Sequence, residues 1–357
     1  MSEVPAPATS SAGMRPPLPG PDTRRALGVS VVVTAYNAAW CIERALDSVF
    51  AQTLVPEEVL VSDDGSTDDT VARVVERYGD AVKLLRLPHR GLTPSRVAAI
   101  EATRGTWFAI MDADDTWQPE KTERQVDFLE RHPEVAWLSS DGVHVSADGV
   151  LAESWLAQYF DPVADMIGDL FPHIVQRCFP LVSSSVVRKD AYLAVGGMDM
   201  DVEYSQDYAL WLRLAARFPV AVMHDRLTTY WSSPNQLSKR IEERYRDDKR
   251  LMERVARGDY RRDPAAQRMA REKIASFEFD LGLICLRSGR YRPGRMHLWR
   301  AAALPGPLRR RAVALFGALT PRAALRHLLR SGWLKRRVHR ARRATPSLMS
   351  GPDEGQR

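Results

Sequence analysis

Short apolar runs alternate with amphipathic segments along the first third of the chain. β-Branched and aliphatic residues fill four runs of strand length, at 29–35, 58–62, 82–87 and 107–111. Between these runs, apolar residues recur at helical spacing in three segments, at 38–52, 69–78 and 94–103. Short apolar runs bounded by turn residues are typical of buried strands. The alternation therefore predicts a doubly wound, mostly parallel α/β sheet with right-handed crossovers.

The pattern changes after this unit. A helix with a proline near its start is expected over 119–131, and a strand over 135–139 leads into a hairpin, so the sheet is predicted to be mixed. The apolar spacing then predicts a helix over 163–177, a strand over 181–188 and a helix within 204–214. The rest of the chain is predicted to be helical, with helices over 241–257, on both sides of Gly289 as a tetratricopeptide-like hairpin, and over 308–319 and 321–343.

Charge is distributed unevenly along the 357 residues. The net charge is +6, but residues 281–352 contain 17 Lys and Arg and no Asp or Glu. The remainder carries 34 basic and 45 acidic residues, so the C-terminal part is a separate electrostatic unit. We therefore expect four parts: a disordered tail at 1–27, an α/β domain at 28–235, a basic helical domain at 236–345 and a disordered tail at 346–357.

Cysteine usage and the N-terminal composition indicate the compartment. Cys41, Cys178 and Cys285 are far apart and follow neither metal-site nor disulfide spacing. The first 27 residues are rich in Pro, Ala and Ser and lack the apolar centre of a signal peptide. The longest apolar runs are much shorter than the roughly 18–20 residues that a membrane span needs. We therefore expect a cytoplasmic protein.

Two of the predicted strands end in acidic residues. Asp63 and Asp64 follow the second strand, and Asp112, Asp114 and Asp115 follow the fourth. Ligand sites in open α/β sheets lie beyond the carboxyl ends of the strands, and carboxylate oxygens suit Mg²⁺ or Mn²⁺. The alternative is an Asp-rich turn that only caps the next helix.

Phosphate-binding glycine motifs are absent from this edge of the predicted sheet. Neither Gly-x-Gly-x-x-Gly nor Gly-x-x-x-x-Gly-Lys-Ser/Thr occurs after the first strand, so a dinucleotide fold and a P-loop are not supported. A phosphate-bearing ligand would need another positive partner. A metal ion on Asp112 and Asp114 would provide one.

Four motifs, in order and spacing, resemble inverting family 2 glycosyltransferases with the GT-A fold. They are VSVVVTAYN at 29–37, LVSDDGSTDDT at 60–70, SR to RGTWFAIMDADD at 95–115 and GG to SQDYALWLRL at 196–214. The resemblance covers roughly residues 28–235. It implies metal-dependent hexosyl transfer with inversion, from a nucleotide sugar, with UDP as the expected nucleotide, to a hydroxyl acceptor. The acceptor is expected to be a saccharide or a lipid-linked sugar in polysaccharide, glycolipid or other glycoconjugate biosynthesis.

The resemblance also implies a role for individual residues. Asp64 would recognise the nucleotide base, and Asp114 would be the direct metal ligand, with Mn²⁺ or Mg²⁺ as cofactor. Asp207, in the first turn of its helix, would be the catalytic base. The remaining residues of the implied donor and metal site are Thr34, Ala35, Tyr36, Arg96, Asp112 and Ala113.

The acceptor side is less defined. Gln206 could contact the acceptor, whereas for Trp211 the apolar helix face favours a core position over a sugar platform. Taken alone, Asp207 could also be no more than a favourable charge at a helix N-terminus. Trp231 departs from the resemblance, because an arginine is common at that place.

Two other functions are compatible with an α/β protein that carries these acids. A sugar-phosphate nucleotidyltransferase is disfavoured, because its Gly-rich loop with Arg and Lys is absent after the first strand. A catalytically silent nucleotide-sugar-binding scaffold is disfavoured by the retained acids at positions 64, 112, 114 and 207.

The basic C-terminal part allows two interpretations. Over 321–343, leucines and Trp333 alternate with Arg and Lys at helical spacing, which suits peripheral contact with an anionic membrane surface. The alternative is a helical bundle whose arginines face water. No recognised module supports binding of nucleic acid.

Overall fold

A computed structural model describes residues 28–161, 163–232 and 240–321. Its strands are β1 (Val29–Ala35), β2 (Glu58–Asp63), β3 (Lys83–Arg86), β4 (Trp107–Asp112), β5 (Thr116–Trp117), β6 (Trp137–Ser146), β7 (Gly149–Ala152), β8 (Met166–Gly168), β9 (Val186–Arg188) and β10 (Val220–Trp231). In the described residues they form one sheet with the order β3-β2-β1-β4-β9-β6-β10-β5, while β7 pairs with β6 and β8 with β10. Strands β3, β2, β1 and β4 are parallel, and β9 is antiparallel to both β4 and β6. The predicted mixed, mostly parallel α/β sheet is confirmed.

Helices cover both faces of the sheet. The helices of this part are α1 (Ile42–Phe50), α2 (Thr70–Tyr78), α3 (Leu92–Glu101), α4 (Lys121–Arg131), α5 (Phe171–Gln176), α6 (Lys189–Ala194) and α7 (Gln206–Arg217). Successive side chains of a strand point to opposite faces. Val31 and Val33 therefore belong to one core with side chains of α1, α2 and α4, whereas Val32 belongs to the other core with side chains of α3, α5 and α7.

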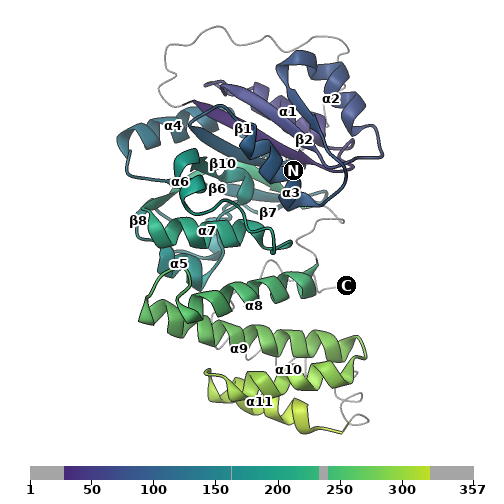
Figure 1. The fold of residues 1–357 in the computed structure, drawn as a ribbon, viewed down its shortest axis with the longest axis vertical. Helices are drawn as coiled ribbons and strands as arrows, with labels where there is room; N and C mark the ends of the chain where they lie inside the picture. The colour runs from purple at the N-terminus through teal and green to yellow at the C-terminus, as the bar shows by residue number, and fades with distance from the viewer. Residues whose placement is uncertain (1–27, 162, 233–239, 322–357) are drawn as a thin grey trace, which may run out of the picture.

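Four further helices extend the molecule beyond the sheet. They are α8 (Ile241–Arg257), α9 (Pro264–Arg287), α10 (Tyr291–Ala303) and α11 (Leu308–Leu319), stacked one after another in Figure 1. The core that contains α7 continues into α8 and the first part of α9, through residues such as Met252 and Phe277. The end of α9 forms a smaller core with α10 and α11. The predicted hairpin around Gly289 and the helix over 241–257 are confirmed.

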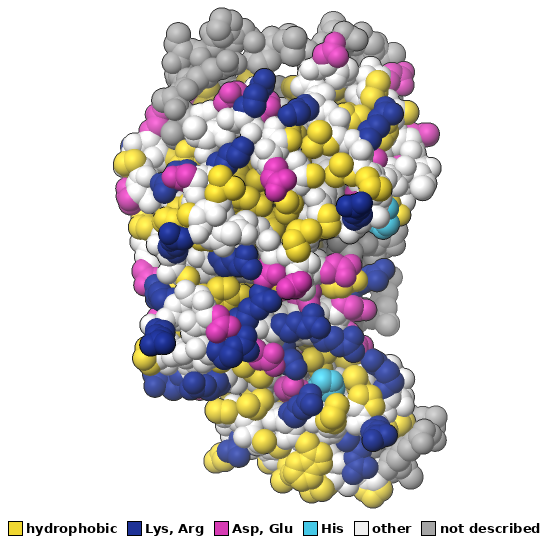
Figure 2. All heavy atoms as spheres, in the orientation of Figure 1, with side chains coloured by type: hydrophobic (Ala, Val, Ile, Leu, Met, Phe, Trp, Pro, Cys, Tyr) yellow, Lys and Arg dark blue, Asp and Glu magenta, His cyan; other side chains and the backbone are white. Residues whose placement is uncertain are grey.

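The helical part has a basic surface. Figure 2 shows Lys and Arg side chains grouped over this part of the molecule, with hydrophobic side chains exposed at its lower end. In the portion of the chain that the structure describes, no helix combines the length and the apolar character needed to cross a bilayer.

Two predicted elements are wrong. The expected helix over 163–177 is instead strand β8 followed by the short helix α5, because Gly168 adopts a φ of +115° and the Asp169 side chain accepts the backbone N–H of Phe171 in a turn. The expected strand over 181–188 begins as a 3₁₀ turn and becomes β9 only at Val186. The hydroxyls of Ser184 and Ser185 both donate to the carbonyl of Leu181, which favours a turn.

Strand β10 was not predicted. Its pairing with β6 is irregular between Met223 and Thr228, so its apolar positions do not alternate regularly. The predicted tails at 1–27 and 346–357, and the helix over 321–343 apart from its first residue, lie outside the described residues.

Candidate active site

The carboxyl ends of three neighbouring strands define the candidate site. Strands β1 and β4 are paired in parallel, with Thr34 opposite Asp112. Strand β2 pairs with the other side of β1, with Asp63 opposite Ala35. The acids that follow β2 and β4 therefore lie on either side of the end of β1.

A buried guanidinium connects these strand ends to α7. Arg96, on α3, is fully buried. Its Nη1 donates to Oε1 of Gln206 at 3.1 Å, and its Nη2 donates to Oγ1 of Thr34 at 3.2 Å. Nη2 also forms an ion pair with Oδ1 of Asp112. The planar fork of an arginine can serve several acceptors at once, so this side chain joins β1, β4 and α7 at one point.

The turn after β4 is fixed by Asp115. This residue is 3% exposed; its Oδ2 accepts the hydroxyl of Ser183 at 2.5 Å, and its Oδ1 accepts the backbone N–H of Trp231 at 3.1 Å. Burial, followed by the charges of Asp114 and Asp112, raises the pKa of Asp115 well above its usual range. Asp115 therefore holds the turn together, whereas the side chain of Asp112 keeps 35% of its surface exposed and is open to a ligand.

A second arginine lies against the same turn. Arg44, on α1, donates from Nη2 to the carbonyl of Asp114 at 2.8 Å, and its guanidinium carbon lies 4.1 Å from the centre of the Trp231 ring. The Trp231 indole in turn donates to Oγ1 of Thr116 at 3.2 Å. Trp231, the residue that departs from the family resemblance, thus packs against the guanidinium of Arg44, which comes from α1. Nothing in the local sequence pattern around Arg44 indicated this contact.

The end of β1 carries an exposed aromatic surface. Tyr36 is 48% exposed and stacks on His89, with ring centres 4.2 Å apart. Asp64 is buried beside them; its two carboxylate oxygens accept the backbone N–H groups of Arg90 and Gly91, each at 2.9 Å. His89 Nδ1 also lies 2.8 Å from Oδ2 of Asp64. The segment 89–91, which sequence reasoning missed, therefore surrounds the acid expected to recognise a nucleotide base.

Two predicted donor-side residues contribute little side-chain surface. Ala35 and Ala113 are both buried. The carbonyl of Ala35 accepts the backbone N–H of Asp64 at 2.9 Å, so Ala35 connects β1 to the acidic turn through its main chain.

The predicted base lies at the start of α7. The helix begins at Gln206, and Asp207 is in its first turn. Asp207 is half-buried. Burial raises its pKa, while the backbone N–H of Tyr208 and the positive charge of Arg96 oppose this rise. A carboxylate whose pKa is shifted towards neutrality by its surroundings is typical of a general base.

Trp211 has a different environment. It is fully buried, and its ring stacks on Trp137 with centres 4.2 Å apart and planes 2° apart. A side chain without exposed surface offers no platform to a sugar. Of the two interpretations, the structure favours the core position.

The donor set suits a metal ion that is shared with a phosphate ligand. Among residues 28–161, 163–232 and 240–321, no group of three His, Cys, Asp or Glu side chains forms a metal cage. Magnesium is usually bound through one or two carboxylates together with substrate phosphates. The partly exposed Asp112 and the neighbouring Asp114 fit that second type of site.

Comparison with known proteins identifies related sequences. Residues 30–178 match the family model described as "Glycosyl transferase family 2". The succinoglycan biosynthesis protein ExoO of Rhizobium meliloti (strain 1021) is 43% identical over 100 residues, which is 28% of this chain and 29% of that protein. The chain spans less than two thirds of the length of the first relatives that it matches.

Solved structures share the architecture. Staphylococcus aureus TarS 1-349 in complex with UDP-GlcNAc has a TM-score of 0.61 at 16% identity, covering 86% of this chain and 92% of that one. The mannosyltransferase PcManGT from Pyrobaculum calidifontis, in complex with GDP-Man and Mn²⁺, has a TM-score of 0.54 at 19% identity, covering 92% and 89%. At these identities the similarity shows a common fold.

Proposed function

We propose that this chain, whose residues 30–178 match the family 2 glycosyltransferase model, is a member of that family and catalyses metal-dependent transfer of a hexosyl group, with inversion, from a nucleotide sugar to an acceptor hydroxyl. A UDP-sugar is the proposed donor, and a saccharide or a lipid-linked sugar in polysaccharide or glycoconjugate biosynthesis is the proposed acceptor. The similar structures of TarS and PcManGT contain UDP-GlcNAc and GDP-Man, which supports the donor class. We also propose a cytoplasmic location for this reaction.

One observation carries the proposal. The buried guanidinium of Arg96 contacts Thr34, Asp112 and Gln206, and Asp207 follows Gln206 directly in the chain. Residues with proposed roles in donor binding, metal binding and proton transfer therefore meet around one side chain of α3, although they come from three other elements, β1, β4 and α7. Catalysis by positioning requires such convergence.

Each residue then has a chemical task. Asp207 would accept the proton of the acceptor hydroxyl as that oxygen attacks the sugar carbon, opposite the leaving diphosphate. Its raised pKa makes it a stronger base than an exposed aspartate. Tyr36 and Asp64 would hold the nucleotide base.

Asp112 and Asp114 would hold Mn²⁺ or Mg²⁺. The metal would supply Lewis-acid stabilisation of charge on the leaving diphosphate. Mn²⁺ accompanies GDP-Man in the similar PcManGT structure, which supports a divalent metal as cofactor.

The Asp207→Asn variant tests the assignment of the base. It should abolish transfer while nucleotide-sugar binding stays nearly unchanged, because only proton transfer is removed. Transfer rates and calorimetric binding of the donor would both be measured. Asp127→Asn, an exposed acid on α4, serves as the matched control. If donor binding in Asp207→Asn fell as much as transfer, the role of this residue would be wrong.

The Asp114→Ala variant tests the metal site. Calorimetry with UDP and Mn²⁺ should show weakened metal-dependent binding, whereas UDP binding without metal should not change.

A screen of UDP-, GDP- and dTDP-sugars for metal-dependent turnover would then identify the donor. Turnover that persists fully in the presence of EDTA would refute metal dependence.

The same screen separates an enzyme from a catalytically silent scaffold. An enzyme of this type should also hydrolyse its donor slowly in the absence of an acceptor, because water can replace the acceptor hydroxyl. Donor binding without hydrolysis or transfer would favour the scaffold. Release of pyrophosphate from a nucleoside triphosphate and a sugar phosphate would indicate a nucleotidyltransferase.

We further propose that the helical end of the molecule contacts an anionic membrane surface. Large apolar side chains are exposed on α10 and α11, including Trp299 (48%), Leu308 (81%), Phe316 (48%) and Leu319 (56%). No acidic residue occurs from position 281 to 352. Apolar side chains beside arginines suit the boundary of an anionic bilayer and would bring the enzyme close to a lipid-linked acceptor.

Flotation with liposomes tests this contact. The full chain should float with vesicles that contain anionic lipid and should stay at the bottom of the gradient with neutral vesicles. A chain without residues 308–357 should not float with either. If the full chain stayed at the bottom with anionic vesicles, the proposal would be refuted in favour of a bundle whose arginines face water. Equal flotation of both chains would refute a contact made through residues 308–357.

A further inference from the structure

Helix α8 holds the three residues that precede the α7 helix and its aspartate. Oδ2 of Asp247 accepts the backbone N–H groups of Glu203 and Tyr204, at 3.2 and 2.9 Å. Oδ1 of Asp248 accepts the hydroxyl of Ser205 at 2.7 Å. Ser205 is the N-cap of α7, but its side chain does not cap that helix, because the hydroxyl is bonded to α8 instead.

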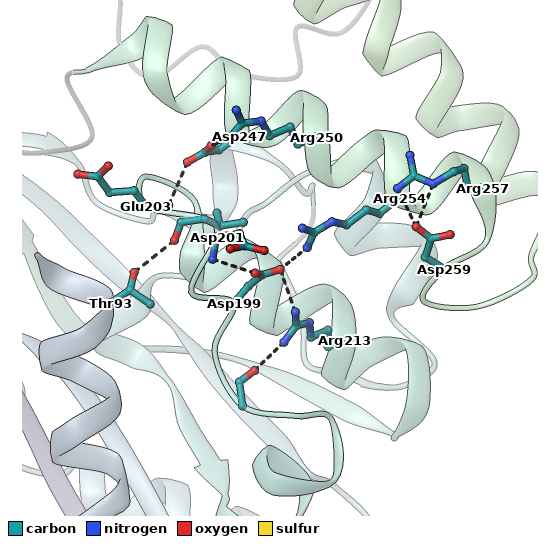
Figure 3. A network of polar contacts seen from close by, with 12 residues as sticks. Thr93, Asp199, Asp201, Glu203, Arg213, Asp247, Arg250, Arg254, Arg257 and Asp259 are labelled. Carbon is teal, nitrogen blue, oxygen red and sulfur yellow. Dashed lines mark hydrogen bonds and ion pairs between the residues drawn. The ribbon is translucent and has the colours of Figure 1, made fainter.

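The loop before α7, residues 197–205, is also bound at its N-terminal end. Asp199 accepts a hydrogen bond from Nη2 of Arg213, on α7, at 2.8 Å and forms an ion pair with Arg254, on α8. Arg213 also donates to the carbonyl of Gly197 at 2.9 Å, and Thr93, on α3, donates to the carbonyl of Val202 at 3.3 Å. Figure 3 shows this network, in which the segment lies between α3, α7 and α8.

These contacts lie close to the reacting end of α7. Gln206 and Asp207 follow directly after Ser205, and Gln206 is bonded to Arg96. Any movement of residues 203–205 would therefore shift Asp207 relative to Asp112. A displacement of about 1 Å at a reacting group can lower a rate by about 100-fold.

Buried carboxylates are a costly way to hold a loop. Asp247 is 5% exposed and Asp248 is 1% exposed, and an ionised carboxylate loses hydration when it is buried. For Asp247 the Arg250 guanidinium, 3.4 Å away, offsets part of this loss. Burial raises the pKa of Asp248 to about 6. A loop that needed only stability could be held by uncharged side chains at lower cost.

We propose that Asp247 and Asp248 are positioning residues of the transfer reaction, through which α8 fixes the start of α7 and the orientation of Asp207. The inference rests on the proposed role of Asp207 as base. It makes a helix beyond the family 2 motifs part of the catalytic unit.

Kinetics of alanine variants test this role. Asp247→Ala and Asp248→Ala should lower kcat by about 10- to 100-fold. The dissociation constant of the nucleotide donor should stay within about twofold, because the proposed donor residues lie at the ends of β1, β2 and β4 and on α3, and none of them lies on α7 or α8. Asp248→Asn keeps an oxygen that can accept the Ser205 hydroxyl and should restore most of kcat. Ser205→Ala removes only that hydroxyl and provides a milder variant in case an alanine at 247 or 248 prevents folding.

A matched control separates positioning from stability. Glu242 is a carboxylate on the same helix, and it forms ion pairs with Arg290, which precedes α10, and with Arg246 of α8 itself. Glu242→Gln should change the melting temperature without changing kcat. The inference is wrong if kcat stays unchanged in both alanine variants and in Ser205→Ala, or if Glu242→Gln lowers kcat in proportion to its loss of stability.

The Asp207→Asn variant separates failure of the positioning role from failure of the proposed base. If Asp207→Asn retains full transfer, the assignment of the base fails. If Asp207→Asn loses transfer while the α8 variants keep full kcat, only the positioning role fails.

Discussion

Replacement of Arg96 by methionine should affect stability and activity together. The guanidinium is fully buried and serves three acceptors, on Thr34, Asp112 and Gln206. Breaking a buried ion pair by removing one partner costs about 3–5 kcal/mol. Because the Asp112 side chain is 35% exposed, water can hydrate the carboxylate that is left behind, so we expect the lower value of about 3 kcal/mol. Arg96→Lys keeps the charge but not the planar fork, so its free energy of unfolding should lie between that of the native protein and that of Arg96→Met.

Thermal unfolding and transfer kinetics measure these effects. A loss of about 3 kcal/mol corresponds to a melting temperature lowered by roughly 6–12 °C in a domain of this size. The value of kcat should also fall, because Arg96 connects Gln206 to Asp112. Arg73→Met is the matched control, since the side chains of Arg73 and of its ion-pair partner Glu43 are 45% and 34% exposed and exposed pairs contribute about 0–1 kcal/mol. An Arg96→Met protein with unchanged stability and kcat would refute the reasoning.

Three further predictions concern buried groups. Trp211→Ala should lower the free energy of unfolding by about 3–5 kcal/mol with no change in acceptor KM, measured by denaturant unfolding and kinetics, because the ring is stacked on Trp137. Asp248→Asn should gain thermal stability over the native protein as the pH rises: the melting temperature of the variant minus that of the native protein should be larger at pH 8 than at pH 5. Burial raises the pKa of Asp248 to about 6 in the folded protein, so ionised Asp248 destabilises the fold above that pH. The destabilisation is lost as the pH falls from there towards the lower pKa of the unfolded chain. The acidic limb of kcat should lie above the pKa of an ordinary aspartate, because the rate requires ionised Asp207 and burial raises its pKa; a limb at or below that ordinary value would contradict this.

Local pattern was sufficient to predict the first half of the sheet. Residues 29–35 and 107–112 are short apolar runs whose ends carry turn-forming and acidic residues, so both the strands and the edge that they share could be predicted. Strand β10 was missed because its register shifts twice between Met223 and Thr228. The 3₁₀ turn before β9 depends on serine hydroxyls that bond to the backbone, which an apolar pattern does not show.

Site residues could be predicted from the sequence where they are acids that directly follow a strand. Asp64 and Asp112 are such residues. Asp248 could not be found in this way, because it lies 43 residues from its partner Ser205 on a helix with many other charged residues. Arg44 reaches the acidic turn only through folding, since it lies 70 residues from Asp114. Contacts of this kind follow from packing and not from local sequence.

The charge asymmetry of the chain coincides with a division in its packing. The run without acidic residues begins at position 281. The core shared with the sheet includes Tyr245, Phe277 and Leu281, and the smaller helical core begins at Phe279 and includes Leu298. Both changes occur within α9, well after the predicted boundary at residue 235. We therefore propose that α8 and the first part of α9 work with the α/β domain, as the contacts of Asp247 and Asp248 require. The end of α9 and the helices after it would then form the basic unit that is free to contact a membrane.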